Sequence, residues 1–152
     1  MSSSLTPVRL AVYIATTLVA VFGVVFVADA LVESDEERLE AIEGALEGAR
    51  GEARADALAQ LSGEEAVAVV ADRRRVWIEP GDGEAALREA IASAVPELTD
   101  DTPVVGTDAT LAGQRGRITV RLREGHDEPV DVVVELALED HAFSLLEVRR
   151  LR

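Results

Sequence analysis

The sequence predicts an α+β protein with an N-terminal transmembrane helix, an amphipathic stalk helix and a small mixed domain. Three observations carry this prediction. Residues 10–28 contain no charged side chain, residues 33–62 repeat apolar residues at intervals of three and four, and residues 117–138 hold two stretches in which polar and apolar side chains alternate. The last two patterns are those of an amphipathic helix and of half-buried strands. We therefore divide the chain into a tail (1–9), a transmembrane segment (10–32), a stalk helix (33–62) and an α+β domain (63–152).

The apolar run Leu10–Ala28 matches the thickness of a membrane. Its 19 residues would form a helix of about 28 Å, close to the roughly 30 Å of a bilayer's hydrocarbon core. A single segment in lipid must satisfy its own backbone hydrogen bonds, and only a helix does so. We expect the lipid bilayer to be the partner of Leu10–Ala28, with residues 10–32 acting as a signal-anchor.

Charges on the two sides of the run predict its orientation. Arg9 precedes it without any acid, whereas Asp29, Glu33 and Asp35 follow it. The positive-inside rule then places the tail in the cytoplasm and the C-terminal domain outside the cell membrane. The small residues around Ala30 also suit a signal peptidase, so a secreted protein cleaved near Ala30 is the alternative. The length of the run favours retention of the anchor.

Charge composition is extreme. The formal net charge is −14, and all 15 basic residues are arginine. Such a chain resembles proteins of salt-loving archaea, and a high-GC actinobacterium is the alternative source. Molar salt shortens the Debye length to about 3 Å and screens the repulsion. Strong acidity argues against nucleic acid as a partner. The absence of cysteine excludes disulfides, thiolate metal sites and cysteine nucleophiles.

A helix is predicted over residues 33–62. Leu39, Ile42 and Leu46 form its apolar stripe, and alanines continue the stripe. Ser34 followed by Glu37 has the spacing of a capping box. Glycines within the segment weaken the helix by about 1 kcal/mol each, so it needs packing. It packs either on the sheet of its own domain or, as the alternative, on another copy in a coiled coil.

A strand, tight turn and second strand are predicted for Ala66–Ala71, Asp72–Arg75 and Val76–Glu79. The turn contains the only run of three consecutive basic residues in the chain. Either this cluster is a charged hairpin tip balanced by nearby acids, or it contacts anionic lipid headgroups or an acidic partner. The candidate interaction residues are Arg73, Arg74, Arg75 and Trp77.

Trp77 faces away from Val76 and Ile78 in such a strand. We expect it to pack beneath the following helix or the stalk, and stacking on a ligand is the alternative.

A short helix and four strands complete the domain. The helix covers Glu84–Val95 and ends before Pro96. The strands begin with Val104–Ala112, and the last one passes through Phe143, Leu145 and Val148.

The two middle strands align in a single register. It places Leu122 opposite Val130 and Val120 opposite Val132 on one face, and Arg121 beside Asp131 and Arg117 beside Glu135 on the other. A slip by one residue would destroy both matches, so this register is specified twice.

No residue set in the sequence carries a catalytic motif, and we expect no enzyme activity, no cofactor and no identifiable small-molecule substrate. The last three strands resemble the closing meander of cystatin-like and NTF2-like domains. The anchor, stalk and domain are similar in layout to bitopic assembly proteins of pilus and secretion machines. The resulting hypothesis is a single-pass membrane protein whose external domain mediates protein contacts or assembly in the cell envelope. A membrane-tethered ligand-binding or sensor domain is the alternative.

Overall fold

The computed structural model describes residues 33–151, and the residues from Asp35 onward form one compact unit. The predicted tail, the transmembrane segment and the cleavage site near Ala30 lie outside the described residues. Within residues 33–151, no helix is both long and apolar enough to span a bilayer.

The structure has two helices where the sequence predicts one over residues 33–62. Helix α2 covers Asp35–Gly48 and α3 covers Glu52–Ala59. Gly51 stands between them at a φ of 56°, a conformation that residues with a side chain rarely adopt. The chain therefore turns at this glycine.

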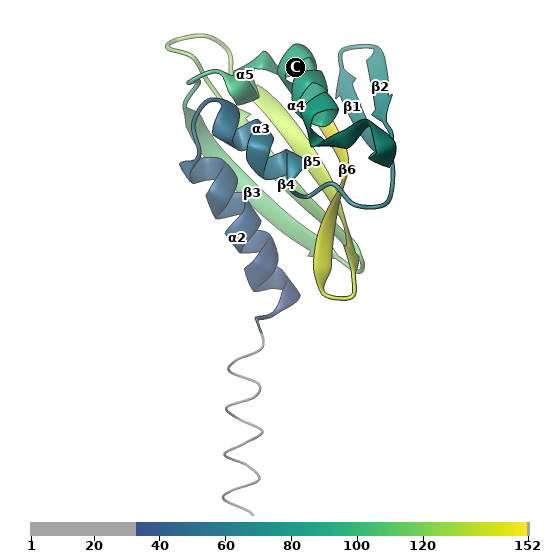
Figure 1. The fold of residues 1–152 in the computed structure, drawn as a ribbon. Coiled ribbons are helices and arrows are strands. Elements are labelled where there is room, and N and C mark those ends of the chain that lie inside the picture. The colour runs from purple at the N-terminus through teal and green to yellow at the C-terminus, as the bar shows by residue number, and fades with distance from the viewer. Residues whose placement is uncertain (1–32, 152) are drawn as a thin grey trace, which may run out of the picture. The chain divides into compact units, whose positions relative to one another are not determined.

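Both helices belong to the domain. Leu39 and Leu46 of α2 are buried, and α2 packs against strands β3 and β4. Leu58 of α3 is also fully buried. The expectation that this apolar face packs on the sheet of its own domain is confirmed, because the same residues that suggested a stripe enter the core. Figure 1 shows α2 and α3 lying across the sheet.

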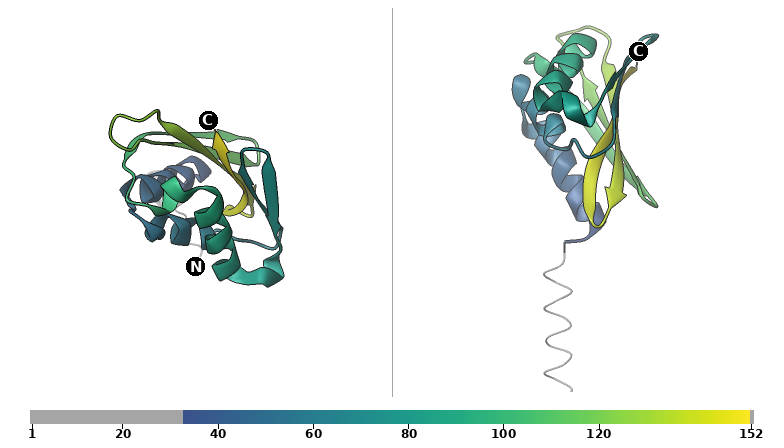
Figure 2. Two further views of the ribbon diagram at one scale, coloured as in Figure 1. Left: turned by 90° about the horizontal axis from the view of Figure 1, so that it is seen from above. Right: turned by 45° about the vertical axis from the view of Figure 1, so that its right-hand side comes forward.

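A six-stranded sheet forms the second layer, and the helices cover one of its faces (Figure 2). The strands are β1 (Val67–Ala71), β2 (Arg74–Ile78), β3 (Val104–Ala112), β4 (Arg115–Leu122), β5 (Val130–Glu139) and β6 (Ala142–Leu151), in the spatial order β2-β1-β6-β5-β4-β3. The predicted antiparallel meander is confirmed as β3 to β6. The sequence did not indicate that β1 pairs with β6 in parallel and so joins the hairpin to the meander.

Between the hairpin and the meander lie a 3₁₀ turn (Pro80–Asp82), α4 (Gly83–Ala94) and α5 (Pro96–Thr99). Leu87 and Ile91 of α4 and Val95, the residue that follows it, are buried. Pro96 ends α4 because its ring disfavours a helical conformation in the preceding residue, and it begins α5.

The predicted register of β4 and β5 is confirmed at all four pairs. On the open face, Arg121 Nε lies 2.7 Å from Asp131 Oδ1 and Arg117 Nη2 lies 2.8 Å from Glu135 Oε1. The hydrogen bond from Arg121 lowers the pKa of Asp131 below its usual range. Charge pairing and apolar matching thus select one alignment.

A bulge in β6 allows apolar residues that are three positions apart to point to the same face of the sheet. Glu135 pairs with Glu147 and Leu136 with Leu145, so Leu146 is an extra residue in β6. Leu145 and Val148 therefore both point to the helix-covered face despite their odd spacing, and both are buried.

Aliphatic side chains fill the space between the sheet and the helices. Ile118, Val120, Val132, Val134 and Leu136 have no exposed surface. They form one cluster with buried residues of α2, α3, α4 and α5.

Candidate functional site

The β1–β2 hairpin holds the residues that the sequence singled out. A two-residue turn, Asp72 and Arg73, joins its strands, with Asp72 at a φ of 53°. Arg74 and Arg75 are the first residues of β2 rather than part of the turn. Because β2 is the end strand of the sheet, one of its edges pairs with no strand of the described chain. Such an edge presents backbone N–H and C=O groups to possible partners.

The open edge is exposed along nearly its whole length. Residues 74–77 are all exposed, and only Ile78 is half-buried. Trp77 retains 55% of its surface and Val76 retains 49%. Strand edges with apolar side chains are usually covered in soluble proteins.

The expected packing of Trp77 beneath a helix is wrong. Trp77 lies opposite Ala68 of β1, on the sheet face that the helices leave open, whereas Val76 lies opposite the buried Val69 on the other face. The prediction that Trp77 and Val76 lie on opposite faces of the strand is therefore confirmed, but the prediction that the helices cover the face with Trp77 is wrong. The guanidinium carbon of Arg75 lies 5.6 Å from the centre of the Trp77 ring, which is within cation–π range.

On the helix-covered face of the sheet, away from Trp77, β2 borders a groove of about 680 Å³ that lies between the hairpin and α4. Its apolar lining comes from both elements: Val69, Ala71 and Val76 from the hairpin, and Ala86, Ala90 and Ala94 from α4. This groove was not predicted from the sequence. The pattern in the sequence that could have indicated the groove is the row of small residues along one side of α4, which leave room beside Val76.

Arginines surround the tip of the hairpin. A cleft of about 570 Å³ is lined by Asp72, Arg73, Arg74, Arg150 and Leu151. Arg150 forms an ion pair with Glu97 of α5, with Arg150 Nη2 lying 2.6 Å from Glu97 Oε1. This bond raises the pKa of Arg150.

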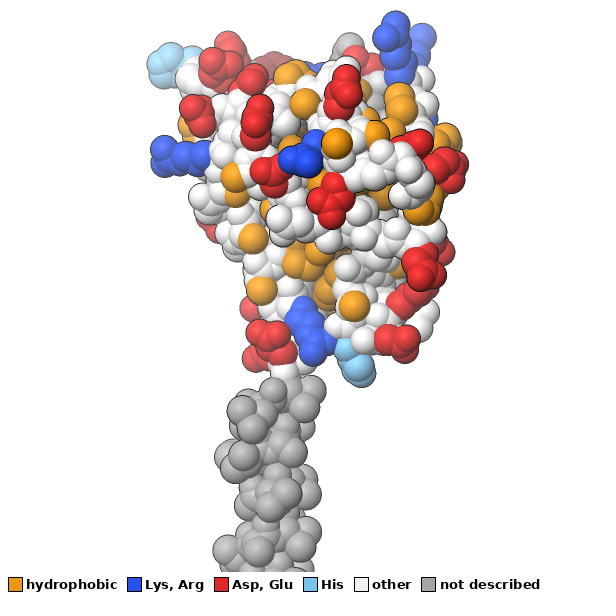
Figure 3. Space-filling view, viewed as in Figure 1, with side chains coloured by type: hydrophobic (Ala, Val, Ile, Leu, Met, Phe, Trp, Pro, Cys, Tyr) orange, Lys and Arg blue, Asp and Glu red, His pale blue; other side chains and the backbone are white. Residues whose placement is uncertain are grey.

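Arg73 and Arg74 make no ion pair with any residue of the described chain, while Arg75 Nη2 lies 3.4 Å from Glu147 Oε2. Figure 3 shows acidic side chains spread over the helical face and a basic group at the hairpin tip at the upper right, with other basic side chains scattered over this face. Balance of the triplet by nearby acids, one of the two predicted interpretations, is thus observed in the described chain for Arg75 only.

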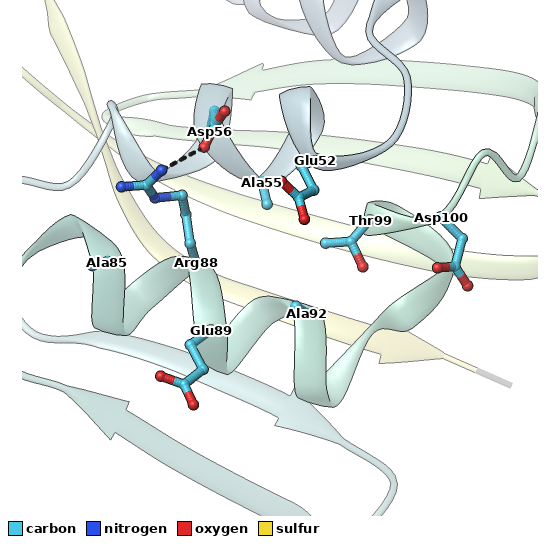
Figure 4. A pocket seen from close by; sticks show the side chains of 9 residues that line it. All are labelled: Glu52, Ala55, Asp56, Ala85, Arg88, Glu89, Ala92, Thr99 and Asp100. Carbon is cyan, nitrogen blue, oxygen red and sulfur yellow. Dashed lines mark hydrogen bonds and ion pairs between the residues drawn. The ribbon is translucent and has the colours of Figure 1, made fainter.

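A second cleft, of about 470 Å³, lies between α3, α4 and α5. Arg88 reaches from α4 to Asp56 of α3 with a separation of 3.0 Å, and Glu89 points away from this pair (Figure 4). The cleft is otherwise lined by carboxylates and small residues. No group of three histidines or carboxylates in the described part of the chain could hold a metal ion.

The comparisons with known proteins place the fold. No family model matches this chain, and no curated protein matches it in sequence. An NTF2-like protein with a cystatin-like fold from Novosphingobium aromaticivorans is similar over 95% of this chain and 88% of its own, with a TM-score of 0.51 and 11% identity.

A provisionally assigned dehydratase of the NTF2-like family from Streptomyces avermitilis is similar over 77% of this chain and 96% of its own, with a TM-score of 0.50 and 11% identity. At this identity the likeness concerns the fold. The domain therefore has the cystatin-like or NTF2-like fold that the closing strands resembled.

Proposed function

We propose that the protein is a single-pass membrane protein whose external domain is a protein-interaction or assembly module of the cell envelope. The observation that carries the proposal is the edge of β2 that pairs with no strand of the described chain, with Val76 and Trp77 exposed on the two faces of β2. The apolar run Leu10–Ala28 supports the anchor, and Arg9 ahead of it supports an external domain. In this arrangement the anchor holds the edge strand near envelope proteins.

Crosslinking in intact cells tests the contact. A photoreactive phenylalanine analogue replaces Trp77 in the full chain, and a matched variant carries it at Asp127, an exposed loop residue between β4 and β5. We expect one discrete protein adduct from position 77 and none from position 127. Only uncrosslinked protein from both variants would contradict the proposal, and protease shaving of the same cells reports the orientation.

The groove beside α4 favours a second candidate function, a membrane-tethered ligand-binding or sensor domain. Because side chains fill the space between sheet and helices, an apolar ligand would occupy this groove, which is large enough for a small molecule. Such a ligand would co-purify with the full chain and be detected by mass spectrometry of an organic extract.

A further inference from the structure

We infer that β2 accepts an extended acidic segment of a partner protein as an added strand of the sheet. The inference rests on the proposed function, because it names the binding mode and the chemistry of the partner. Main-chain hydrogen bonds to a free edge supply affinity in this mode, and alternate side chains of the added strand supply specificity.

The backbone of β2 can take such a strand. Its residues 74–77 are exposed, and its only strand neighbour in the described chain is β1, on the other edge. Two protective features of natural edges, a proline and a bulge, are missing from residues 74–78, whose pairs with β1 run without interruption. An added strand would extend the sheet without displacing any strand of residues 33–151.

Each face of the sheet beside this edge offers contacts for the side chains of an added strand. An added strand would direct every second side chain into the groove lined by Val76 and the alanines of α4. The side chains between these would lie beside Arg75 and Trp77 on the open face. The groove suits small apolar residues, and the open face suits residues that pair with arginine.

Charge selects an acidic occupant. Arg73 and Arg74 have no ion-pair partner in the described chain, and Arg75 approaches only Glu147, at 3.4 Å. In a protein of net charge −14, this is where a negatively charged segment is attracted. A second copy of the β1–β2 hairpin brings three arginines of its own and only Asp72 and Glu79 beside them, so it matches the positive charge less well than an acidic segment does.

A synthetic peptide tests the mode directly. The probe is an eight-residue peptide of alternating glutamate and valine, blocked at both ends and fluorescently labelled. One control has the same composition with all glutamates first, and a second carries N-methyl groups on alternate residues and so loses backbone donors. Fluorescence anisotropy is measured with the full chain in detergent, at the lowest salt at which circular dichroism shows the folded state.

We expect the alternating peptide to bind, and both controls to bind about tenfold more weakly or not at all, since they lose the alternation or the backbone bonds. Arg73→Glu with Arg74→Glu should weaken binding about tenfold through the reversal of two exposed charges. Val76→Lys should also weaken it, because a lysine at the edge blocks strand addition. The matched control, Arg115→Glu with Arg123→Glu, reverses two exposed arginines elsewhere and should leave binding unchanged.

Other outcomes overturn the inference. Failure of the alternating peptide to bind, or equal binding of the block peptide, excludes strand addition. Binding of phosphatidylglycerol vesicles through Arg73 and Arg74 without peptide binding would assign the arginines to the membrane. A dimer of the full chain that Val76→Lys dissociates would make a second copy the occupant. A crosslinked adduct from position 77 combined with absent peptide binding would leave the proposed function standing and reject only this mode.

Discussion

A single buried arginine ties three parts of the domain together. Arg54 in α3 is only 2% exposed. Its Nε donates to the carbonyl oxygen of Ala49 at 2.9 Å, and its Nη1 donates to that of Thr102 at 2.8 Å. It therefore joins the break after α2 to the segment that leads into β3. Burial lowers the pKa of Arg54, and the charge of Arg50 acts in the same direction.

We expect Arg54→Met to destabilise the protein by about 2–3 kcal/mol. Methionine fills a similar volume but leaves one buried and one partly buried carbonyl oxygen without a donor, and each costs about 1–3 kcal/mol. The matched control is Arg88→Met, which removes an exposed ion pair with Asp56 and should cost about 0–1 kcal/mol. The measurement is the urea midpoint of the full chain in detergent, and equal midpoints for the two variants would refute the structural role of Arg54.

At the level of elements, α2 lies close to the sheet because one strand position lacks a side chain. A Cβ on Gly116 of β4 would come within 3.0 Å of Leu39 Cδ1 in α2 and of Phe143 Cε1 in β6. Gly116 thus allows Leu39 of α2 and Phe143 at the beginning of β6 to meet over β4. This contact makes the predicted stalk part of the domain.

Gly116→Val should therefore loosen the packing of α2 and destabilise the protein by about 1–3 kcal/mol, which is typical of overpacking. Gly106→Val is the control, because a Cβ on Gly106 in the neighbouring β3 meets nothing within 4 Å. Amide hydrogen exchange should show faster exchange in α2 for the first variant only. Unchanged protection of α2 in both variants would contradict this account.

At the scale of the whole domain, charge is divided between the layers. Helices α2 to α5 contain eleven acidic residues and three arginines, whereas the six strands contain five acidic residues and seven arginines. The helical layer is therefore strongly negative, while the sheet carries a small positive excess. Repulsion within the helical layer opposes the compact state, and salt screens it.

We expect the full chain in detergent to lose its folded circular dichroism signal at low salt and to regain it as salt rises. Glu36, Glu40 and Glu47 of α2 are exposed, so replacing all three by glutamine should lower the salt concentration needed for folding. A spectrum that does not change with salt in the wild-type chain would contradict the expected halophilic adaptation.

The sequence by itself determined the features that depend on near neighbours. The register of β4 and β5 follows from an alternation of apolar and charged residues that only one alignment satisfies, and α4 ends where Pro96 prevents its continuation. The sequence also singled out Arg73, Arg74, Arg75 and Trp77, because three consecutive basic residues in an acidic chain are conspicuous, and their role in an interaction stays a prediction.

The tertiary structure alone decided the rest. Parallel pairing of β1 with β6, the turn at Gly51 and the burial of Arg54 depend on contacts between residues far apart in the chain. The exposure of Trp77 has the same origin. Alternation says that Trp77 and Val76 lie on opposite faces of a strand, but only the position of the helices on one face of the sheet decides which side chain is left in the open.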